Sequence, residues 1–268
     1  MITSLGPAAL IRIAGRDALA FAHAQFTSDV RGLAEGAWQW SAWLDAQGRA
    51  RAVFLLLRVA PDELLAWQPL GDPATLNTSL ARFVMRAAVR IEAIDATVEA
   101  IDAPHDVLAG RVAHDGAGWT FALADGRRVR LVPGDPRPAN AAALAEWRLR
   151  DIEARLPLLP EAMAGECTPQ ALDLESIDAI RFDKGCYPGQ EIAARLHFRG
   201  GNKRHLHRAA AQGHASLGAG DELFDPAGAL AGRILYVAGS SSPRVLGVIA
   251  DGSSRTLKTT AGTTILVD

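Results

Sequence analysis

Cysteine is scarce in this chain of 268 residues, which contains only Cys167 and Cys186. Two cysteines cannot form the network of disulfides that holds small secreted proteins together. They also cannot provide the four thiolates of an ordinary iron–sulfur cluster, so one chain alone cannot hold such a cluster. Because the two residues lie 19 positions apart, their spacing fits no compact metal-ligand motif and predicts no metal site.

Long apolar runs and an excess of charge of one sign are also missing. The most apolar stretch, Val53 to Leu57, is far too short to span a bilayer. The first residues lack the basic region of a secretory signal, and Arg12 interrupts the next apolar run. We therefore expect a cytoplasmic protein that has no membrane partner. Lysine and arginine total 28 and aspartate and glutamate 30, so the net charge of −2 gives no general reason for nucleic-acid binding.

The first hundred residues show patterns of both strands and helices. Residues 10–15 alternate as a short strand, residues 17–25 are typical of a helix with Asp17 near its start, and Asp45 to Gly48 separate two apolar segments as in a hairpin. A strand at 63–67, a helix opened by Asp72-Pro73 and a strand at 88–94 follow. In the helix, Leu76, Leu80, Phe83 and Val84 recur at helical spacing. Strands with one helix between them predict an α+β unit over residues 37–96.

The remainder of the chain changes character twice. Asp125-Gly126 joins two apolar segments, 119–123 and 127–132, and predicts a second hairpin. The alanine-rich stretch 139–154 favours a helix. From residue 213 onward, regularly spaced glycines separate short β-branched runs, which predicts a small all-β barrel or sandwich.

The segment from Arg181 to Arg195 carries the most chemical information. Tyr187-Pro188-Gly189-Gln190 suits a type II turn, because proline presets φ at the second position and glycine accepts positive φ at the third. Cys186 is then held on a tight loop with Gly185 beside it. A helix over 191–198 would place the thiol near the positive end of its dipole, and Lys184 would add positive potential. Both effects favour the reactive thiolate.

Each of these features also has a purely structural interpretation. A lone cysteine is most often a small buried hydrophobe, and Cys167 has no setting that suggests more. Residues 192–212 contain no acidic side chain but several arginines and histidines. Such a run is either a solvated face or an anion site in which arginines match carboxylates or phosphates. RNA binding is disfavoured, since Phe198 is the only aromatic ring other than histidine in the run.

The motif Lys184-Gly185-Cys186-Tyr187-Pro188-Gly189-Gln190-Glu191 resembles the signature of the YgfZ-type folate-binding proteins, which are relatives of the glycine-cleavage T-protein (aminomethyltransferase). Further segments carry the resemblance over most of residues 10–208, and three examples show it. They are Ile152-Glu153-Ala154-Arg155-Leu156-Pro157, Gln25-x-Thr27-x-Asp29-Val30 and Asp45-Ala46-x-Gly48-Arg49.

The resemblance implies a three-domain, α+β, aminomethyltransferase-like folate-binding fold with a ferredoxin-like insertion and a C-terminal β-barrel. On this basis residues 1–36 and 97–204 form a discontinuous folate-binding domain. Residues 37–96 form the inserted ferredoxin-like unit, and residues 205–268 form the barrel. The domains would surround a channel that receives tetrahydrofolate.

The resemblance also assigns roles to individual residues. Trp147 stands where the family has a tryptophan implicated in folate binding, and Tyr187, Gln190 and Glu191 of the motif are further candidate ligand contacts. For the anionic glutamate tail of the folate, the cationic side chains are Arg195, Arg199 and Lys203. Cys186 is the candidate reactive thiol, with Lys184 as its cationic neighbour.

Two positions depart from the family and its relatives. A second family tryptophan has no counterpart, because its place falls near Ala8. Aminomethyltransferases carry two aspartates after the first hairpin, and here Ala52 and Val53 replace them. These side chains cannot take or orient a proton.

The function implied is therefore that of a tetrahydrofolate-binding accessory protein for iron–sulfur cluster assembly or repair. It would support iron–sulfur enzymes, including tRNA-modifying enzymes, and its partners would be folate and, transiently, iron–sulfur proteins or assembly factors. The alternative is a folate-dependent, aminomethyltransferase-like one-carbon transferase, so whether the chain is an enzyme stays open.

Overall fold

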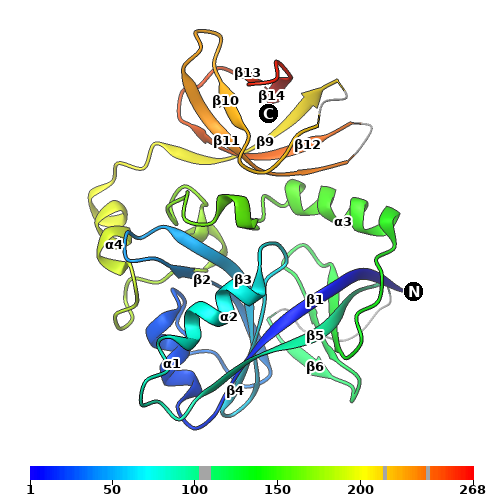
Figure 1. Ribbon diagram of the computed structural model, residues 1–268, viewed down its shortest axis with the longest axis vertical. Helices are drawn as coiled ribbons and strands as arrows, with labels where there is room; N and C mark the ends of the chain where they lie inside the picture. The colour runs from blue at the N-terminus through cyan, green and yellow to red at the C-terminus, as the bar shows by residue number, and fades with distance from the viewer. Residues whose placement is uncertain (103–109, 214–215, 240–241) are drawn as a thin grey trace.

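The computed structural model describes residues 1–102, 110–213, 216–239 and 242–268. It has two main parts, an eight-stranded sheet and a closed six-stranded barrel, with helix α3 (Ala141–Glu153) between them (Figure 1). This confirms the predicted α+β fold with a β-barrel at the C-terminal end. No helix in the described part is long and apolar enough to cross a bilayer.

The sheet has the strand order β2-β3-β4-β1-β5-β8-β7-β6. Its strands are β1 (Ile2–Ala14), β2 (Ala37–Leu44), β3 (Ala50–Ala60), β4 (Glu63–Trp67), β5 (Arg90–Ile101), β6 (Val112–His114), β7 (Trp119–Ala122) and β8 (Arg128–Pro133). Both hairpins predicted from the sequence are present, as β2–β3 and β7–β8. The predicted boundary between residues 96 and 97 falls inside β5, which pairs with β1 on one side and with β8 on the other.

Two strands are longer than the sequence pattern predicts. The strand predicted at 10–15 is the end of β1, and the strand predicted at 88–94 is the start of β5. Gly6 and Pro7 suggest a turn, but the ladder between β1 and β5 continues through them with a register shift at Ser4/Gly6. Leu5 is the extra residue of this bulge, and Gly6, with a φ of +113°, follows it, so the strand continues through both Gly6 and Pro7.

In the described part of the chain, four α-helices accompany the strands: α1 (Ala18–Gln25), α2 (Pro73–Ala81), α3 (Ala141–Glu153) and α4 (Gln190–Arg199). The Asp72 side chain caps α2 by accepting hydrogen bonds from the N–H groups of Ala74 and Thr75. The helical spacing that extends to Phe83 and Val84 overestimates α2, which ends at Ala81.

The barrel contains β9 (Arg204–Gln212), β10 (Glu222–Phe224), β11 (Leu230–Ala238), β12 (Arg244–Ala250), β13 (Thr256–Thr259) and β14 (Thr264–Val267). Pairing between β10 and β13 closes it. One apolar core cluster joins the sheet, α3 and the barrel, and includes Trp67, Trp147 and Tyr236. The Tyr236 hydroxyl also donates to the carbonyl of Leu156 at 2.9 Å, which fixes the barrel to the segment after α3.

The domain ranges inferred from the family resemblance stay predictions. The range 97–204 includes residues 103–109, and the range 205–268 includes 214–215 and 240–241; these segments lie outside the described residues.

Candidate functional site

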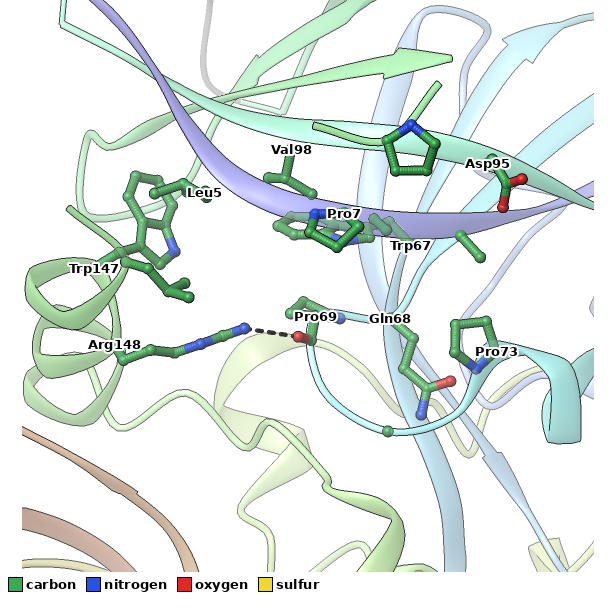
Figure 2. A pocket seen from close by; sticks show the side chains of 15 residues that line it. Leu5, Pro7, Trp67, Gln68, Pro69, Pro73, Asp95, Val98, Trp147 and Arg148 are labelled. Atoms are coloured by element: carbon green, nitrogen blue, oxygen red, sulfur yellow. Dashed lines mark hydrogen bonds between the residues drawn. The ribbon is translucent and has the colours of Figure 1, made fainter. Parts of the chain in front are cut away.

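A cavity of about 360 Å³ lies between β1, α3 and the loop that joins β4 to α2 (Figure 2). The Trp147 ring and Leu5 lie at one end of it, and Gln68 lies towards the other end. Trp67 provides a second indole wall from the last position of β4. Arg148 borders the cavity and donates to the carbonyl of Pro69 at 2.8 Å. The cavity therefore has mostly apolar walls and a few fixed polar groups.

Local sequence explains why Trp67 and Gln68 face this space. Trp67 pairs with Leu10 of β1, and Pro69 lacks the N–H group that would continue the ladder. Gly71 has a φ of +102°, and a Cβ there would overlap the amide of Gln68. The side-chain Oε1 of Gln68 is buried and has no hydrogen-bond partner among the described residues. This loop thus leaves one unsatisfied acceptor in the wall of the cavity.

A buried charge network supports Trp147 from behind. The Arg127 guanidinium lies 4.4 Å from the centre of the Trp147 ring, and its side chain is only 1% exposed. Its Nη1 donates to Asp151 Oδ1 at 2.7 Å and to the Trp147 carbonyl at 3.1 Å, and its Nε donates to Asp125 Oδ2 at 2.6 Å. Arg148 donates to the second oxygen of Asp151 at 3.1 Å. Trp147 is thereby held in one orientation and is itself only 8% exposed.

The cysteine loop forms the predicted turn. The N–H group of Gln190 donates to the Tyr187 carbonyl at 3.2 Å, and Gly189 has φ +73° and ψ 0°, as the third position of a type II turn requires. Cys186 is exposed, whereas Cys167 is buried. Burial is the main reason that the pKa of Cys167 rises to about 11, with Glu166 adding to the shift.

Lys184 fixes this loop to the C-terminal end of α1. Its ammonium group donates to the backbone carbonyls of His23 at 2.6 Å, Phe26 at 2.5 Å and Ser28 at 2.8 Å. It also lies 5.0 Å above the ring centre of Tyr187. An ammonium group has three donors, so all three are used by the protein itself. The structure therefore shows Lys184 in a positioning role.

Tyr187 is buried and does not line the tryptophan cavity. Its hydroxyl donates to the carbonyl of Arg181 at 3.1 Å, and burial raises the pKa of this phenol. The N–H group of Arg181 in turn donates to the carbonyl of Thr27 at 2.9 Å. The Thr27 hydroxyl donates to Ala179 at 2.6 Å and accepts from the N–H group of Ala42 at 2.9 Å. Segments far apart in the sequence are thus joined by hydrogen bonds next to the segment that holds Tyr187.

An imidazole lies under Gly185, the residue before Cys186. A Cβ at Gly185 would lie 3.7 Å from Nε2 of His23, which is only 8% exposed. Nδ1 of the same ring is 3.3 Å from Asp29 Oδ1 but is not aligned for a hydrogen bond. Burial lowers the pKa of His23, Lys184 and Arg31 lower it further, and Asp29 opposes them. Burial also lowers the pKa of Lys184 to about 8, which Asp29 opposes and Arg31 reinforces.

The other predicted contacts are not brought to the tryptophan cavity. Gln190 is half-buried at the start of α4, and Glu191, Arg195, Arg199 and Lys203 are exposed. None of these residues, and no residue of the cysteine motif, lines the cavity that contains Trp147. In Figure 1, α3 and α4 lie towards opposite sides of the molecule. The predicted set therefore divides between two places.

Sequence reasoning missed several residues that surround Trp147. These are Trp67, Gln68, Arg127, Arg148 and Asp151. The helical spacing of Trp147, Arg148 and Asp151 was a usable signal, because positions three and four apart share one face of a helix. No local signal indicates that Trp67, Gln68 and Arg127 meet that face.

The positions that depart from the aminomethyltransferase pattern hold no carboxylate or indole. Ala52 and Val53 are at most 1% exposed and lie in two apolar core clusters. Ala8 lines the tryptophan cavity, so a small side chain stands where the missing indole was expected. Within the described ranges, no group of three or more His, Cys, Asp or Glu residues is placed to hold a metal ion.

Comparison with solved structures identifies the class of fold. The chain superposes on the glycine cleavage system aminomethyltransferase T of Bartonella henselae with a TM-score of 0.68 and 17% identity, covering 99% of this chain and 84% of that one. The sheet, the barrel and the arrangement between them thus define an aminomethyltransferase-like α+β protein.

Comparison with curated sequences identifies the family. The chain is 30% identical over 248 residues to the tRNA-modifying protein YgfZ of Aliivibrio fischeri strain MJ11, covering 83% of this chain and 74% of the relative. It is 32% identical over 219 residues to an uncharacterized protein of Haemophilus influenzae, and 29% identical over 252 residues to YgfZ of Pectobacterium carotovorum strain PC1. A scan against models of protein families finds no match. The chain belongs to the YgfZ family.

Proposed function

We propose that this protein binds tetrahydrofolate and, with it, supports the assembly or repair of iron–sulfur enzymes, including those that modify tRNA. The observation that carries the proposal is the cavity beside Trp147. The name "tRNA-modifying protein" carried by several relatives supports the tRNA part of the proposal.

The cavity suits the ring system of a folate. Its volume of about 360 Å³ lies in the range of small-molecule sites, which combine apolar walls with few polar groups. The rings of Trp147 and Trp67 and the side chain of Leu5 provide flat apolar contacts. The Oε1 of Gln68 is an acceptor with no hydrogen-bond partner among the described residues, and a reduced pterin has several N–H donors. A ligand that pairs with this oxygen removes the cost of a buried unsatisfied acceptor, about 1–3 kcal/mol.

These residues divide the work of holding the ligand. Trp147 and Trp67 exclude water from the rings, Gln68 orients them, and the network of Arg127 and Asp151 keeps Trp147 in place. When bound, tetrahydrofolate supplies a nitrogen carrier for one-carbon groups.

Cys186 provides the second chemical group of the proposal. Its thiol is exposed on a loop whose backbone is fixed by Lys184 and by the turn at Gly189. Thiolates are preferred ligands of iron in iron–sulfur clusters. Since the only other cysteine is buried, the remaining ligands must come from the partner protein. In this proposal Cys186 contacts the partner's cluster from outside.

Folate binding is tested by titrating the protein with tetrahydrofolate and following binding by isothermal titration calorimetry. Trp147→Phe removes the indole from the cavity and should weaken binding several-fold. Trp119→Phe is the matched control, because Trp119 lies on β7 and lines no wall of this cavity. Absence of binding, or equal binding by all three proteins, would contradict the proposal.

The role of the thiol is tested separately by complementation. In a strain that lacks its own copy of the protein, Cys186→Ala should fail to restore the activity of iron–sulfur enzymes while still binding tetrahydrofolate. Cys167→Ala should restore it, because Cys167 is buried away from solvent. Full complementation by Cys186→Ala would remove the thiol from the mechanism.

A one-carbon transferase is the second candidate, favoured by the similarity in fold to aminomethyltransferase T. The side chains of Ala52 and Val53 are apolar and buried, so they supply no general base. Formation of methylenetetrahydrofolate from tetrahydrofolate and an aminomethyl donor, with release of ammonia, would establish this activity and can be followed by absorbance.

A further inference from the structure

Charge is unevenly distributed along the chain, although its total is small. Residues 73–91 and 192–212 contain eight of the 28 lysines and arginines and none of the 30 acidic residues. Six of these cations are exposed and make no ion pair within the part of the chain that the structure describes: Arg82, Arg86, Arg195, Arg199, Lys203 and Arg204. The net charge of −2 thus conceals two positively charged segments.

Large apolar side chains are exposed in the same two segments. In the loop after α2, Phe83 is 46% exposed and Met85 is 87% exposed. On α4, Ile192 is 40% exposed and Phe198 is 74% exposed. Elsewhere in the described ranges, the large apolar side chains that are comparably exposed are those of Met1, Ile2 and Leu230. Exposed apolar groups and unpaired cations therefore coincide.

The structure adds aromatic rings that lie outside the basic segments in the sequence. Phe182, which precedes the cysteine loop, stacks on His197 with ring centres 4.3 Å apart and planes at 22°. Phe198 packs edge-on against His197 at 4.7 Å. Trp43 of β2 packs edge-on against Phe83 at 6.3 Å. Each exposed phenylalanine is therefore held by a neighbouring ring.

The turn between β2 and β3 brings the two segments to the same side of the molecule. A Cβ at Gly48 in this turn would lie 2.9 Å from the Cβ of Ile192. Trp43, which contacts Phe83, lies near the end of β2, just before the turn. In Figure 1, α4 and the chain after α2 lie along one side of the molecule. A Cβ at Gly48 would also lie 3.1 Å from the carbonyl oxygen of Gly189, so the cysteine loop borders this surface.

The cations outnumber the carboxylates around α4 and the turn. Two carboxylates beside the aromatic rings are paired with neighbouring side chains, Glu175 with His197 and Asp183 with Arg181. Asp45, Asp178 and Glu191 make no ion pair within the described residues. Asp45 accepts hydrogen bonds from two N–H groups of its own turn. Three unpaired carboxylates thus stand against six unpaired cations, and the surface keeps a positive charge.

Cations and aromatic rings together recognise single-stranded nucleic acid. Unpaired arginine and lysine side chains neutralise phosphates, and exposed rings offer faces on which bases stack. An acidic protein would pair with the cations but would leave Phe83 and Phe198 without a matching contact. Folded RNA presents unstacked bases in its loops and bulges, whereas DNA is mostly double-stranded. The chemistry of the surface therefore favours RNA.

We propose that the surface formed by α4, the β2–β3 turn and the loop after α2 binds single-stranded regions of RNA. The six unpaired cations contact phosphates, and Phe83 and Phe198 stack with bases. Bound RNA then lies beside the loop that carries Cys186. The inference does not depend on folate binding, because none of these side chains lines the tryptophan cavity. The sequence disfavours RNA because it shows only the total charge and a single phenylalanine within residues 192–212.

The test measures the fluorescence anisotropy of a labelled, unstructured RNA of about 16 nucleotides, a length that covers one single-strand site. The wild-type protein should bind this strand at least about tenfold more tightly at about 50 mM salt than at about 200 mM, because bound phosphates release counterions. A duplex of the same sequence should bind about tenfold more weakly than the strand, because its paired bases cannot stack on the rings.

Substitutions separate the rings from the cations. Phe198→Ala should weaken binding of the strand about tenfold without changing its salt dependence. The double variant Arg195→Gln/Arg199→Gln should weaken binding and also make it less dependent on salt, because fewer phosphates are neutralised. Arg82→Gln/Arg86→Gln should act in the same way, which tests whether the loop after α2 belongs to the surface.

Two matched controls change similar side chains elsewhere. Leu230→Ala removes an exposed apolar side chain of β11. The double variant Arg128→Gln/Arg150→Gln removes two arginines that make no ion pair within the described residues. Both controls should bind the strand as the wild-type protein does. Circular dichroism and thermal unfolding establish that all variants fold.

Three outcomes would overturn the proposal. The first is absence of RNA binding, or equal losses in the variants and the controls. The second is equal affinity for strand and duplex with no effect of Phe198→Ala, since phosphates alone would then hold the ligand. The third is binding of polyglutamate of similar length as tightly as RNA, which would mean that the surface takes an acidic protein.

Discussion

The tryptophan cavity and the cysteine loop each depend on one cation, which is buried in the first and half-buried in the second, and the two cations are neutralised differently. Arg127 behind Trp147 is paired with the carboxylates of Asp125 and Asp151. Lys184 beneath the cysteine loop donates only to backbone carbonyls. The first arrangement holds a side chain in one orientation through charge, and the second holds a backbone through neutral acceptors. The Trp147 side chain and the cysteine loop are therefore held in place by two separate sets of interactions.

The largest loss of unfolding free energy is expected when a carboxylate that pairs with Arg127 is removed. Asp151→Leu removes the more deeply buried of the two carboxylates that pair with Arg127, and breaking a buried ion pair in this way costs about 3–5 kcal/mol of unfolding free energy. Asp183→Leu is the matched control, because Asp183 pairs with Arg181 at a side-chain exposure of 70%. Exposed pairs contribute about 0–1 kcal/mol. Urea unfolding measures the free energy of unfolding of both variants. Equal losses in Asp151→Leu and Asp183→Leu would show that Arg127 does not depend on Asp151.

A smaller loss of unfolding free energy is expected when the ammonium group of Lys184 is removed. Lys184→Met deletes three charge-assisted hydrogen bonds and leaves the carbonyls of His23, Phe26 and Ser28 without that donor. Because neutral carbonyls near the surface can be rehydrated, we expect a loss of about 2–3 kcal/mol.

Amide hydrogen exchange should show where this loss occurs. Protection should fall around residues 181–190 and at the end of α1, while α3 stays protected. Lys203→Met, which changes an exposed lysine, should change neither the unfolding free energy nor the amide protection of the cysteine loop. If Lys184→Met left exchange in the cysteine loop unchanged, the lysine would not be what fixes the loop.

The same comparison explains what could be predicted from the sequence. The turn at Tyr187–Gln190 depends on the local conformational preferences of proline and glycine, and the structure contains it. The hairpins and the barrel follow from alternation and regularly spaced turns, which are also local signals. The exposed position of Cys186 follows from the same turn.

The tryptophan cavity depends on pairing over long sequence distances, which local patterns do not encode. Trp67 reaches the cavity because β4 pairs with β1, and Arg127 reaches Trp147 through the β7–β8 hairpin. The exposed cations of α4 match the folate tail by charge, but sequence spacing shows only that charges cluster and not which cavity they face.

The smallest expected effect is on the pH dependence of the unfolding free energy, through the His23 imidazole beneath the cysteine loop. Burial, Lys184 and Arg31 lower the pKa of His23 in the folded protein, against the opposing charge of Asp29. The unfolded chain, with an ordinary histidine pKa near about 6.5, then binds the proton more readily than the folded chain. The contribution of neutral His23 is therefore fully present above that pH, and it is lost as the pH falls from about 6.5 towards the folded-state pKa.

Urea unfolding at pH 7.5 and pH 5.5 tests whether His23 makes the protein less stable at the lower pH. His23→Gln should lose less unfolding free energy on acidification than the wild-type protein. The difference between the two proteins should be smaller than the effect of Asp151→Leu or Lys184→Met. The variant should still lose some stability on acidification, because burial also lowers the pKa of His207 in the barrel. His114→Gln, at an exposed position on β6, should follow the wild-type pH dependence. An unchanged or steeper loss in His23→Gln would mean that the ring accepts a proton in the folded state, with Asp29 outweighing burial and the two cations.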